Sequence, residues 1–344
     1  MKTQIPRDSC FQRKRQASGQ AGKRNRFFRY PDGAVANTLA IGYCLSGYVG
    51  ALALLAGAPF YWWPLAVLWL GHSLVIAAYL IHECTHGTLF SRQRHHHRLA
   101  VVLAWLTGAC YGDFGAIREK HLRHHVERAD IVALDPRALM ARHPRLRRLV
   151  AAGQWAMLPA VEILMHLLVV LYPFRRGGSW RQRSRVLAIL GLRIIYFAAL
   201  ATLGWQVIVG YGLAYLLFLQ VMAFMDALQH TYEVRLSLAG PRARPTRSRD
   251  YEEANTYSNL LSRRFPALNL LVLNFCYHNI HHRRAAEPWH RLPRLHNEHY
   301  GTDPGPVVSP GEQCRRFFRQ RLDRMADTAP AAAGAAGVSF LTPL

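Results

Sequence analysis

Long apolar runs separated by arginine-rich joints constrain the fold of this chain more than any other feature of its sequence. The 344 residues are 51% hydrophobic and still carry a formal net charge of +23, and the two properties occupy different segments. A helix needs about 20 apolar residues to cross the hydrocarbon core of a bilayer. Four segments meet this requirement, and we expect them to span a membrane: residues 36–57, 63–81, 187–209 and 213–229.

The joints between these runs predict two helical hairpins. Residues 58–62 connect the first pair of runs, carry no charge and include three aromatics, which suit a membrane interface. Residues 210–212, also uncharged, are the predicted turn of the second hairpin. The basic residues lie before residue 36, between the hairpins and after residue 229, where the positive-inside rule places them in the cytoplasm. We therefore predict four spans with both termini cytoplasmic.

Two further apolar stretches are not predicted to span. Residues 99–110 are too short, and residues 149–172 carry Glu162 and His166 and have arginines at both ends. We interpret residues 149–172 as one helix lying in the membrane interface. The predicted fold class is an all-α integral membrane protein, with two transmembrane hairpins, interfacial helices and a cytoplasmic cap that carries histidine clusters.

Nine histidines fall into three short clusters and one single position. Residues at i, i+3 and i+4 share one face of a helix, so each cluster aims two or three imidazoles at one point. The predicted topology places all nine on the same side of the membrane. Imidazole binds iron, zinc, copper and nickel, and nine imidazoles exceed the needs of one ion, so we predict two ions. The candidate ligands are His82, His86, His121, His124, His125, His230, His278, His281 and His282.

The other histidines and the cysteines are not predicted to bind a metal. Residues 95–97 lie among arginines and are predicted to be surface side chains, as are His143, His290, His296 and His299. His72 and His166 are predicted to be hydrogen-bonded helix residues and not ligands. The six cysteines are scattered without a CxxC pair, which fits a reducing compartment. The basic charge follows the membrane pattern and no nucleic-acid-binding motif accompanies it, so no nucleic-acid partner is predicted.

One alternative metal site is a zinc protease. His82-Glu83-Cys84-Thr85-His86 matches HExxH, in which Glu83 would be the general base. This alternative leaves the other two clusters unexplained and lacks a carboxylate third ligand in a later span.

The combination of HxxxH, HxxHH and HxxHH around two membrane hairpins resembles the integral-membrane fatty acid desaturase family, which includes related hydroxylases and ketolases. The resemblance covers about residues 35–300, and Asp135-Pro136 also looks like the family. It implies two non-haem irons, O₂ as co-substrate and a separate electron donor of the ferredoxin or cytochrome b5 type. Eight histidines match the boxes one for one, and His230 matches a further ligand histidine after the fourth span.

The resemblance also implies a substrate class. The expected reaction is insertion of a C=C bond into an acyl chain carried by a lipid, CoA or acyl carrier protein, with hydroxylation or ketone formation on a lipid or terpenoid as the alternative. Some animal members have an Asn that reaches iron through water at the place of Asp226. Four polar residues are expected to orient the ligand rings: Glu83, Asp130, Asp226 and Asn279.

The predicted domain plan has four parts. Residues 1–34 form a basic disordered arm, residues 35–300 the membrane domain, residues 301–327 an amphipathic helix region and residues 328–344 a disordered tail. Ser309-Pro310-Gly311-Glu312 predicts a capping box that begins the late helix, and residues 265–277 predict an apolar helix before the third cluster. The expected location is a bacterial inner membrane.

Overall fold

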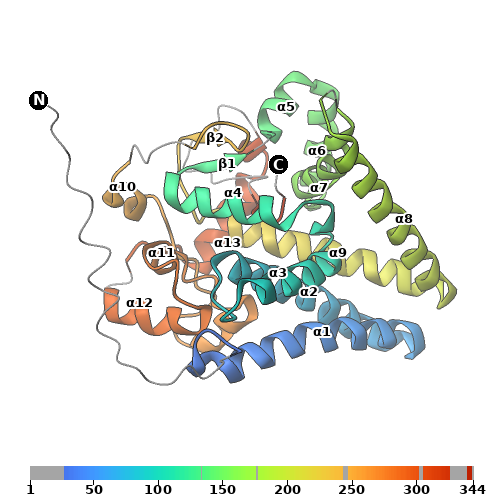
Figure 1. Ribbon diagram of the computed structural model, residues 1–344, viewed down its shortest axis with the longest axis horizontal. Coiled ribbons are helices and arrows are strands. Elements are labelled where there is room, and N and C mark those ends of the chain that lie inside the picture. The colour runs from blue at the N-terminus through green and yellow to red at the C-terminus, as the bar shows by residue number, and fades with distance from the viewer. Residues whose placement is uncertain are drawn as a thin grey trace, which may run out of the picture.

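Four long apolar helices form the body of the molecule, in a computed structural model that describes residues 27–132, 134–175, 177–242, 247–301, 305–325 and 339–342. Each is long and apolar enough to cross a membrane. The predicted all-α membrane fold is confirmed, and Figure 1 shows the shorter helices of the C-terminal part gathered at one end of the four. The four are α1 (Ala34–Gly57), α2 (Trp63–His86), α8 (Trp180–Thr202) and α9 (Trp205–Asp226).

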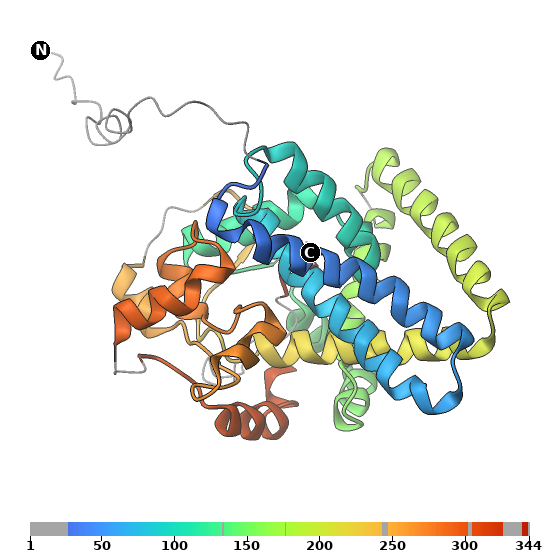
Figure 2. The ribbon, with the colours of Figure 1, turned by 90° about the horizontal axis from the view of Figure 1, so that it is seen from below.

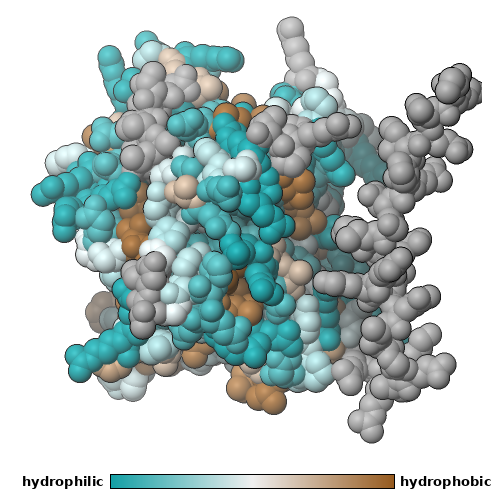
Figure 3. All heavy atoms as spheres, turned by 90° about the vertical axis from the view of Figure 1, so that its left-hand side faces the viewer, coloured by the Kyte–Doolittle hydropathy of each residue, from teal (hydrophilic) through white to brown (hydrophobic). Residues whose placement is uncertain are grey.

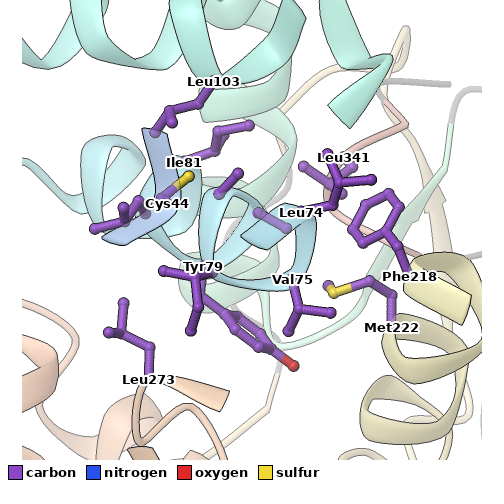
Figure 4. Packing of buried hydrophobic residues seen from close by; sticks show 14 of the residues in the cluster. Cys44, Leu74, Val75, Tyr79, Ile81, Leu103, Phe218, Met222, Leu273 and Leu341 are labelled. Carbon is purple, nitrogen blue, oxygen red and sulfur yellow. The ribbon is translucent and has the colours of Figure 1, made fainter. Parts of the chain in front are cut away.

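Helix α2 lies at the centre of the bundle and packs against α1, α9 and α3 (Gln93–Thr107). Its buried stretch is continuous from Ser73 to Thr85, whereas α1 exposes Val35, Leu39 and Val49 to the surroundings. Figure 4 shows part of this core, and Figure 2 shows α1 and α2 side by side. Apolar side chains that face outward along a helix of this length suit lipid.

The turn of the second hairpin differs from the prediction. It lies at Leu203 and Gly204, where Gly204 has a φ of 123° that only glycine adopts readily. Gly210 lies inside α9, and a Cβ added there would come 2.5 Å from the Leu55 side chain. Gly210 therefore serves the close packing of α9 against α1, where a larger residue would not fit, and it does not form a turn. Hydropathy could not locate the turn because the apolar run is continuous across it.

The segment between the hairpins contains short helices. Asp113 caps α4 (Phe114–Glu127) by accepting a hydrogen bond from the Gly115 N–H. The α5 (Pro136–Arg142), α6 (Pro144–Trp155) and α7 (Ala160–Leu171) helices follow. The single helix predicted over residues 149–172 is therefore wrong. The chain breaks between α6 and α7, where Met157 has a φ of 63° and Pro159 precedes α7. Neither piece is long enough to span, which agrees with the prediction that residues 149–172 do not cross the membrane.

The C-terminal part forms a polar end of the molecule. Strand β1 (Asp130–Val132) pairs in parallel with β2 (Arg235–Ser237) and ties the end of α4 to the chain after α9. Figure 3 shows that the end carrying α10, α11 and α12 is largely hydrophilic. The remaining helices are α10 (Arg249–Ala254), α11 (His278–Arg283), α12 (Leu292–Tyr300) and α13 (Pro310–Arg319).

Two local predictions in this part had different outcomes. The apolar helix predicted over residues 265–277 is instead a 3-10 helix, Pro266–Val272, which ends at Leu273 and Asn274 with φ values of 48° and 57°. The Asn274 N–H donates to the Asn269 carbonyl and closes this bend. The predicted helix start at Ser309 is confirmed, because the Ser309 side chain accepts from the Glu312 N–H at the start of α13, while the Glu312 carboxylate pairs with Arg315.

Both ends of the described chain pack against the body of the molecule. Residues 1–26 lie outside the described part, but Phe28 of the predicted arm stacks on Phe90. At the other end, residues 339–342 of the predicted tail are described, and Phe340 and Leu341 are only 7% and 2% exposed. Burial of these two apolar side chains is favourable because it removes them from water. The disorder of the arm and of the tail stays a prediction.

Candidate metal centre

The first histidine pair forms the last turn of α2. The helix continues past its apolar run to His86 and ends at Gly87, whose φ of 68° gives a left-handed cap. His82 and His86 are four residues apart and therefore share one face of the helix. Their ring centroids are 4.7 Å apart, and His82 is only 1% exposed.

The second and third clusters lie on α4 and α11, and the single histidine lies just after α9. His230 makes an isolated β-bridge with Thr256, so its position depends on pairing with a distant segment. The three clusters lie on helices, as predicted. All nine candidate ligands belong to groups whose ring nitrogens lie close together.

The nine histidines divide into two groups, and in each group one potential ligand atom per residue lies within 4.8 Å of the others. The five-histidine group is His82, His86, His121, His125 and His281. The four-histidine group is His124, His230, His278 and His282.

The two groups cut across the sequence clusters. His124 and His125 belong to different groups, as do His281 and His282. Neighbouring positions on an α-helix point about 100° apart, so one cluster serves two sites. In the five-histidine group the Nε2 atoms of His86 and His121 lie 2.7 Å apart. This cross-cutting arrangement forms two separate sets of imidazoles, each of which could hold a metal ion.

Burial makes these rings good metal ligands. It lowers the pKa of His121, His125, His278 and His282 well below the usual value, and it lowers the pKa of His281 to about 3. The rings are therefore neutral and offer a lone pair each, which is the form that binds a metal. Several buried ring nitrogens have no hydrogen-bond partner among the described residues, including both nitrogens of His82. This donor set fits one ion in each group.

Hydrogen bonds on the far side of two rings fix which nitrogen faces the centre. The His124 Nδ1–H donates to the Ala129 carbonyl at 2.9 Å, leaving Nε2 directed toward His230 Nε2 at 3.0 Å. Likewise His282 Nδ1 lies 3.1 Å from Glu252 Oε1, and its buried Nε2 has no hydrogen-bond partner among the residues that the structure describes. In both cases Nε2 is the nitrogen left for a metal.

Glu252 was missed by the sequence analysis. Besides approaching His282, it accepts a hydrogen bond from Arg128 Nε at 2.9 Å, and it forms a possible third ligand set with His125 and His282. Its position in a short helix of mixed charge gave no periodic signal. A pair of acidic residues, Glu252 and Glu253, within a strongly basic chain was the only hint.

The four polar residues predicted to orient the rings occupy different places. Glu83 Oε1 lies 3.4 Å from His82 Nδ1, and its other oxygen accepts from Thr88 Oγ1 and from the Trp289 N–H. Asn279 instead bonds Ser258 and the Ile280 N–H. Asp130 and Asp226 line a cavity beside the histidines, and their action on the rings stays a prediction.

Two cavities meet the metal centre. A small one of about 60 Å³ borders both groups and is lined by Phe275 and Phe340. A larger one of about 390 Å³ reaches His125 and His282 from the polar end and is lined by Arg128, Arg249 and Glu252. One histidine of each group therefore borders a charged cavity that Glu252 lines.

The remaining histidines lie away from the two groups, with two corrections. His296 is only 6% exposed and its ring packs against Tyr277 and Tyr300, so the predicted surface position is wrong for this residue. His96 is buried, and its Nε2 accepts a hydrogen bond from the Phe90 N–H at 2.9 Å, so the predicted surface position is wrong for this residue. His97 is exposed as predicted. His72 contacts Tyr43 and the Leu271 carbonyl, and the His166 Nδ1–H donates to the Glu162 carbonyl, as expected for hydrogen-bonded helix residues.

Comparison with known proteins gives one match. The family model described as fatty acid desaturase matches residues 60–309, a range that includes all nine histidines and three of the four apolar helices. No curated protein matches the chain.

Proposed function

Because the chain belongs to the fatty acid desaturase family, we propose that it is a membrane-bound, O₂-dependent non-haem di-iron oxidoreductase that inserts a C=C bond into an acyl chain. The observation that carries this proposal is the division of nine buried or partly buried histidines into groups of five and four. With O₂, two non-haem irons supply an oxidant strong enough to remove hydrogen from an unactivated methylene, which no side-chain acid or base can do.

The protein's part in this reaction is to hold neutral rings in place and keep water out. The Ala129 carbonyl and Glu252 orient His124 and His282 by their Nδ1–H groups. Phe275 lies 4.8 Å from His82, centroid to centroid, and forms an apolar wall beside the five-histidine group. A methylene lying against this wall would meet the metal site without bulk water, which limits side reactions.

The proposed partners follow from charge and location. The substrate is an acyl lipid, acyl-CoA or acyl carrier protein, and exposed arginines on α6, such as Arg145, Arg147 and Arg148, suit an anionic head group. Electrons come from a separate ferredoxin- or cytochrome b5-type donor. The metal centre and both termini lie on the cytoplasmic side, as the positive-inside rule indicates, and the membrane is a bacterial inner membrane.

A second candidate is a hydroxylase or ketolase acting on a lipid or terpenoid with the same iron pair. One observation favours it. Glu162 and His166 line a small space next to α9, and neither Glu162 Oε2 nor His166 Nε2 has a hydrogen-bond partner among the described residues. Such groups would suit a substrate that carries a polar group along its chain.

The protease alternative is less well supported. Glu83 already accepts hydrogen bonds from Thr88 and Trp289 and is only 4% exposed, so it has little room to activate a water. Three more histidines share the site with His82 and His86, whereas a catalytic zinc keeps three protein ligands and an open position.

Lipid profiling of a host that expresses the chain tests the proposal, with His281→Ala as the inactive control. We expect a new unsaturated acyl product with the natural chain, none with the variant, and iron in the purified protein. A hydroxylated or keto product would favour the second candidate. A single zinc without iron, in protein made with ample iron, would contradict both.

A further inference from the structure

The described C-terminal segment, residues 339–342, lies inside the molecule next to the five-histidine group. The Phe340 ring centroid is 5.5 Å from that of His82 and 5.7 Å from that of His121. Leu341 lines a small space with Leu219 and Met222 of α9. Figure 4 shows Leu341 in the same cluster as Phe218 and Met222. We call residues 339–342 the tail segment.

A buried lysine holds the tail segment in place. Lys120, next to His121 on α4, is only 3% exposed, and its Nζ donates to the Ser339 carbonyl at 2.9 Å and to the Thr342 carbonyl at 2.7 Å. A buried ammonium needs such partners. Both contacts are to main-chain carbonyls, so they position the backbone of the tail segment and leave Phe340 and Leu341 to fill apolar space.

With the tail segment in place, the cavities that the described residues line beside Phe340 and Leu341 are too small for a long chain. The cavity that borders both histidine groups and Phe340 has a volume of about 60 Å³, and the space lined by Ser339, Leu341 and Thr342 about 10 Å³. Pockets that take a small-molecule ligand usually measure about 300–1,000 Å³.

The two larger cavities do not provide an apolar route to the metal centre. The one of about 390 Å³ reaches His282, but Arg128, Arg249, Glu252 and Arg283 line it. The other, about 540 Å³, is apolar and lies between α1, α2 and the 3-10 helix Pro266–Val272, yet none of the nine candidate ligands borders it.

We infer that the tail segment occupies the channel in which the substrate's acyl chain binds, so that the segment and the substrate compete for one apolar space beside the five-histidine group. This inference rests on the proposed function for the substrate class. Phe340 and Leu341 fill the space that methylene groups would take, between Phe275, α7 and α9. Because substrate binds only the fraction of molecules with the channel open, the tail segment raises the apparent Kd for an acyl chain.

Binding of parinaric acid, a fluorescent fatty acid, to iron-loaded protein without O₂ tests the competition. The double variant Phe340→Ala/Leu341→Ala removes the apolar plug, and Leu322→Ala, at an exposed leucine of the same C-terminal region, is the matched control. We expect the apparent Kd to fall at least about tenfold in the double variant and to stay unchanged in the control, with iron content equal in all three. Unchanged or weaker binding in the double variant with iron retained would overturn the inference.

A labelling experiment gives an answer even if the double variant loses its iron. Phe340→Cys is made together with Cys10→Ser and Cys314→Ser, which leaves only Cys44, Cys84, Cys110 and Cys276 as background thiols, all of them buried. A hydrophilic maleimide should label the introduced thiol slowly in the resting protein and several times faster when fatty acid is added. Labelling that does not respond to fatty acid would overturn the inference.

The two experiments separate this inference from the proposed function, because neither depends on turnover. If fatty acid displaces the tail segment but the natural chain forms no oxidised product with O₂ and electrons, the oxidation chemistry fails and the channel assignment stands. If oxidised lipid accumulates while the tail segment never moves, the proposed function stands and the channel assignment fails.

Discussion

The five-histidine group and the four-histidine group contain the same kind of ligand but differ in how the protein encloses them. The first is built entirely from helices α2, α4 and α11 and borders the aromatic rings of Phe275 and Phe340. The second depends on His230, which follows α9 and pairs with a distant segment, and on His282, which has a carboxylate partner. A charged cavity at the polar end borders Glu252 and reaches one histidine of each group, His282 of the second and His125 of the first.

This difference teaches that two sites with similar ligands need not have similar roles. An apolar wall suits the approach of a carbon chain, and we expect the substrate at the five-histidine group. Glu252 places negative charge beside the four-histidine group, which partly offsets the positive charge of a metal bound there. We expect electrons and water to reach the centre on that side.

The largest expected effect comes from removing one ligand from each group in turn. His281→Ala and His230→Ala should each reduce activity more than about 100-fold, since even the partners behind metal ligands typically contribute 10–100-fold. If the groups bind separately, iron should fall from about two to about one per chain in both variants. Metal analysis and lipid profiling measure the two effects.

Two outcomes would change this comparison. Loss of all iron in either variant would mean that the two groups bind their ions together and cannot be separated. Full iron and turnover in His230→Ala would leave eight ligands and reduce the second group to three histidines. Asp226→Asn, four residues before His230, should be milder and alter activity more than iron content.

Acidification of the metal-free protein should lower its stability. The folded-state pKa of His281 is about 3, against 6.5 for an ordinary histidine, so below pH 6.5 the unfolded chain binds a proton that the folded chain does not. Its contribution is complete above pH 6.5 and is lost as the pH falls from 6.5 toward 3. Thermal unfolding at several pH values measures this dependence.

The matched variant for the pH experiment is His281→Ala. On unfolding, this variant should take up about one proton fewer than the natural chain. Its Tm should therefore fall less steeply than that of the natural chain as the pH is lowered from 6.5 to 3. Iron should move the loss of stability to lower pH, because metal and proton compete for the same lone pair. An identical pH slope in the variant would show that His281 is protonated in the folded protein.

Glu252→Gln tests whether the carboxylate matters to the four-histidine group. The amide keeps the size of the side chain but removes its charge, so the hydrogen bond that orients the His282 ring becomes weaker. We expect about 10–100-fold lower activity or iron affinity. Glu253→Gln is the control, because Glu253 pairs with Arg283 near the surface and contacts no ligand ring. Equal effects in the two variants would argue for a loss of surface charge instead.

The smallest effects are expected at histidines outside both groups. His96→Ala removes the acceptor for the Phe90 N–H and should reduce the free energy of unfolding by about 1–3 kcal/mol without loss of iron. His97→Ala, at an exposed position, should change it by less than about 0.5 kcal/mol. Iron loss in either variant would place the metal centre elsewhere. Chemical unfolding and metal analysis distinguish these results.

The sequence determined the features that depend on short spacing and composition. The runs that became α1 and α2 were predicted to within a few residues, because an apolar run of sufficient length has few other uses. The nine histidines were found because i, i+3 and i+4 spacing sets one face of a helix whatever surrounds it. The same local rules predicted that Ser309 caps a helix, which the structure confirms.

Only the tertiary structure decided how these pieces combine. The turn at Gly204 could not be seen within a continuous apolar run, and the division of His124 from His125 depends on how α4 is rotated against α2 and α11. Glu252 and Phe340 lie far in sequence from the histidines they approach, so no local pattern connects them. The spacing of residues a few positions apart determines which face of a helix each side chain occupies. The packing of segments distant in sequence determines which residues that face contacts.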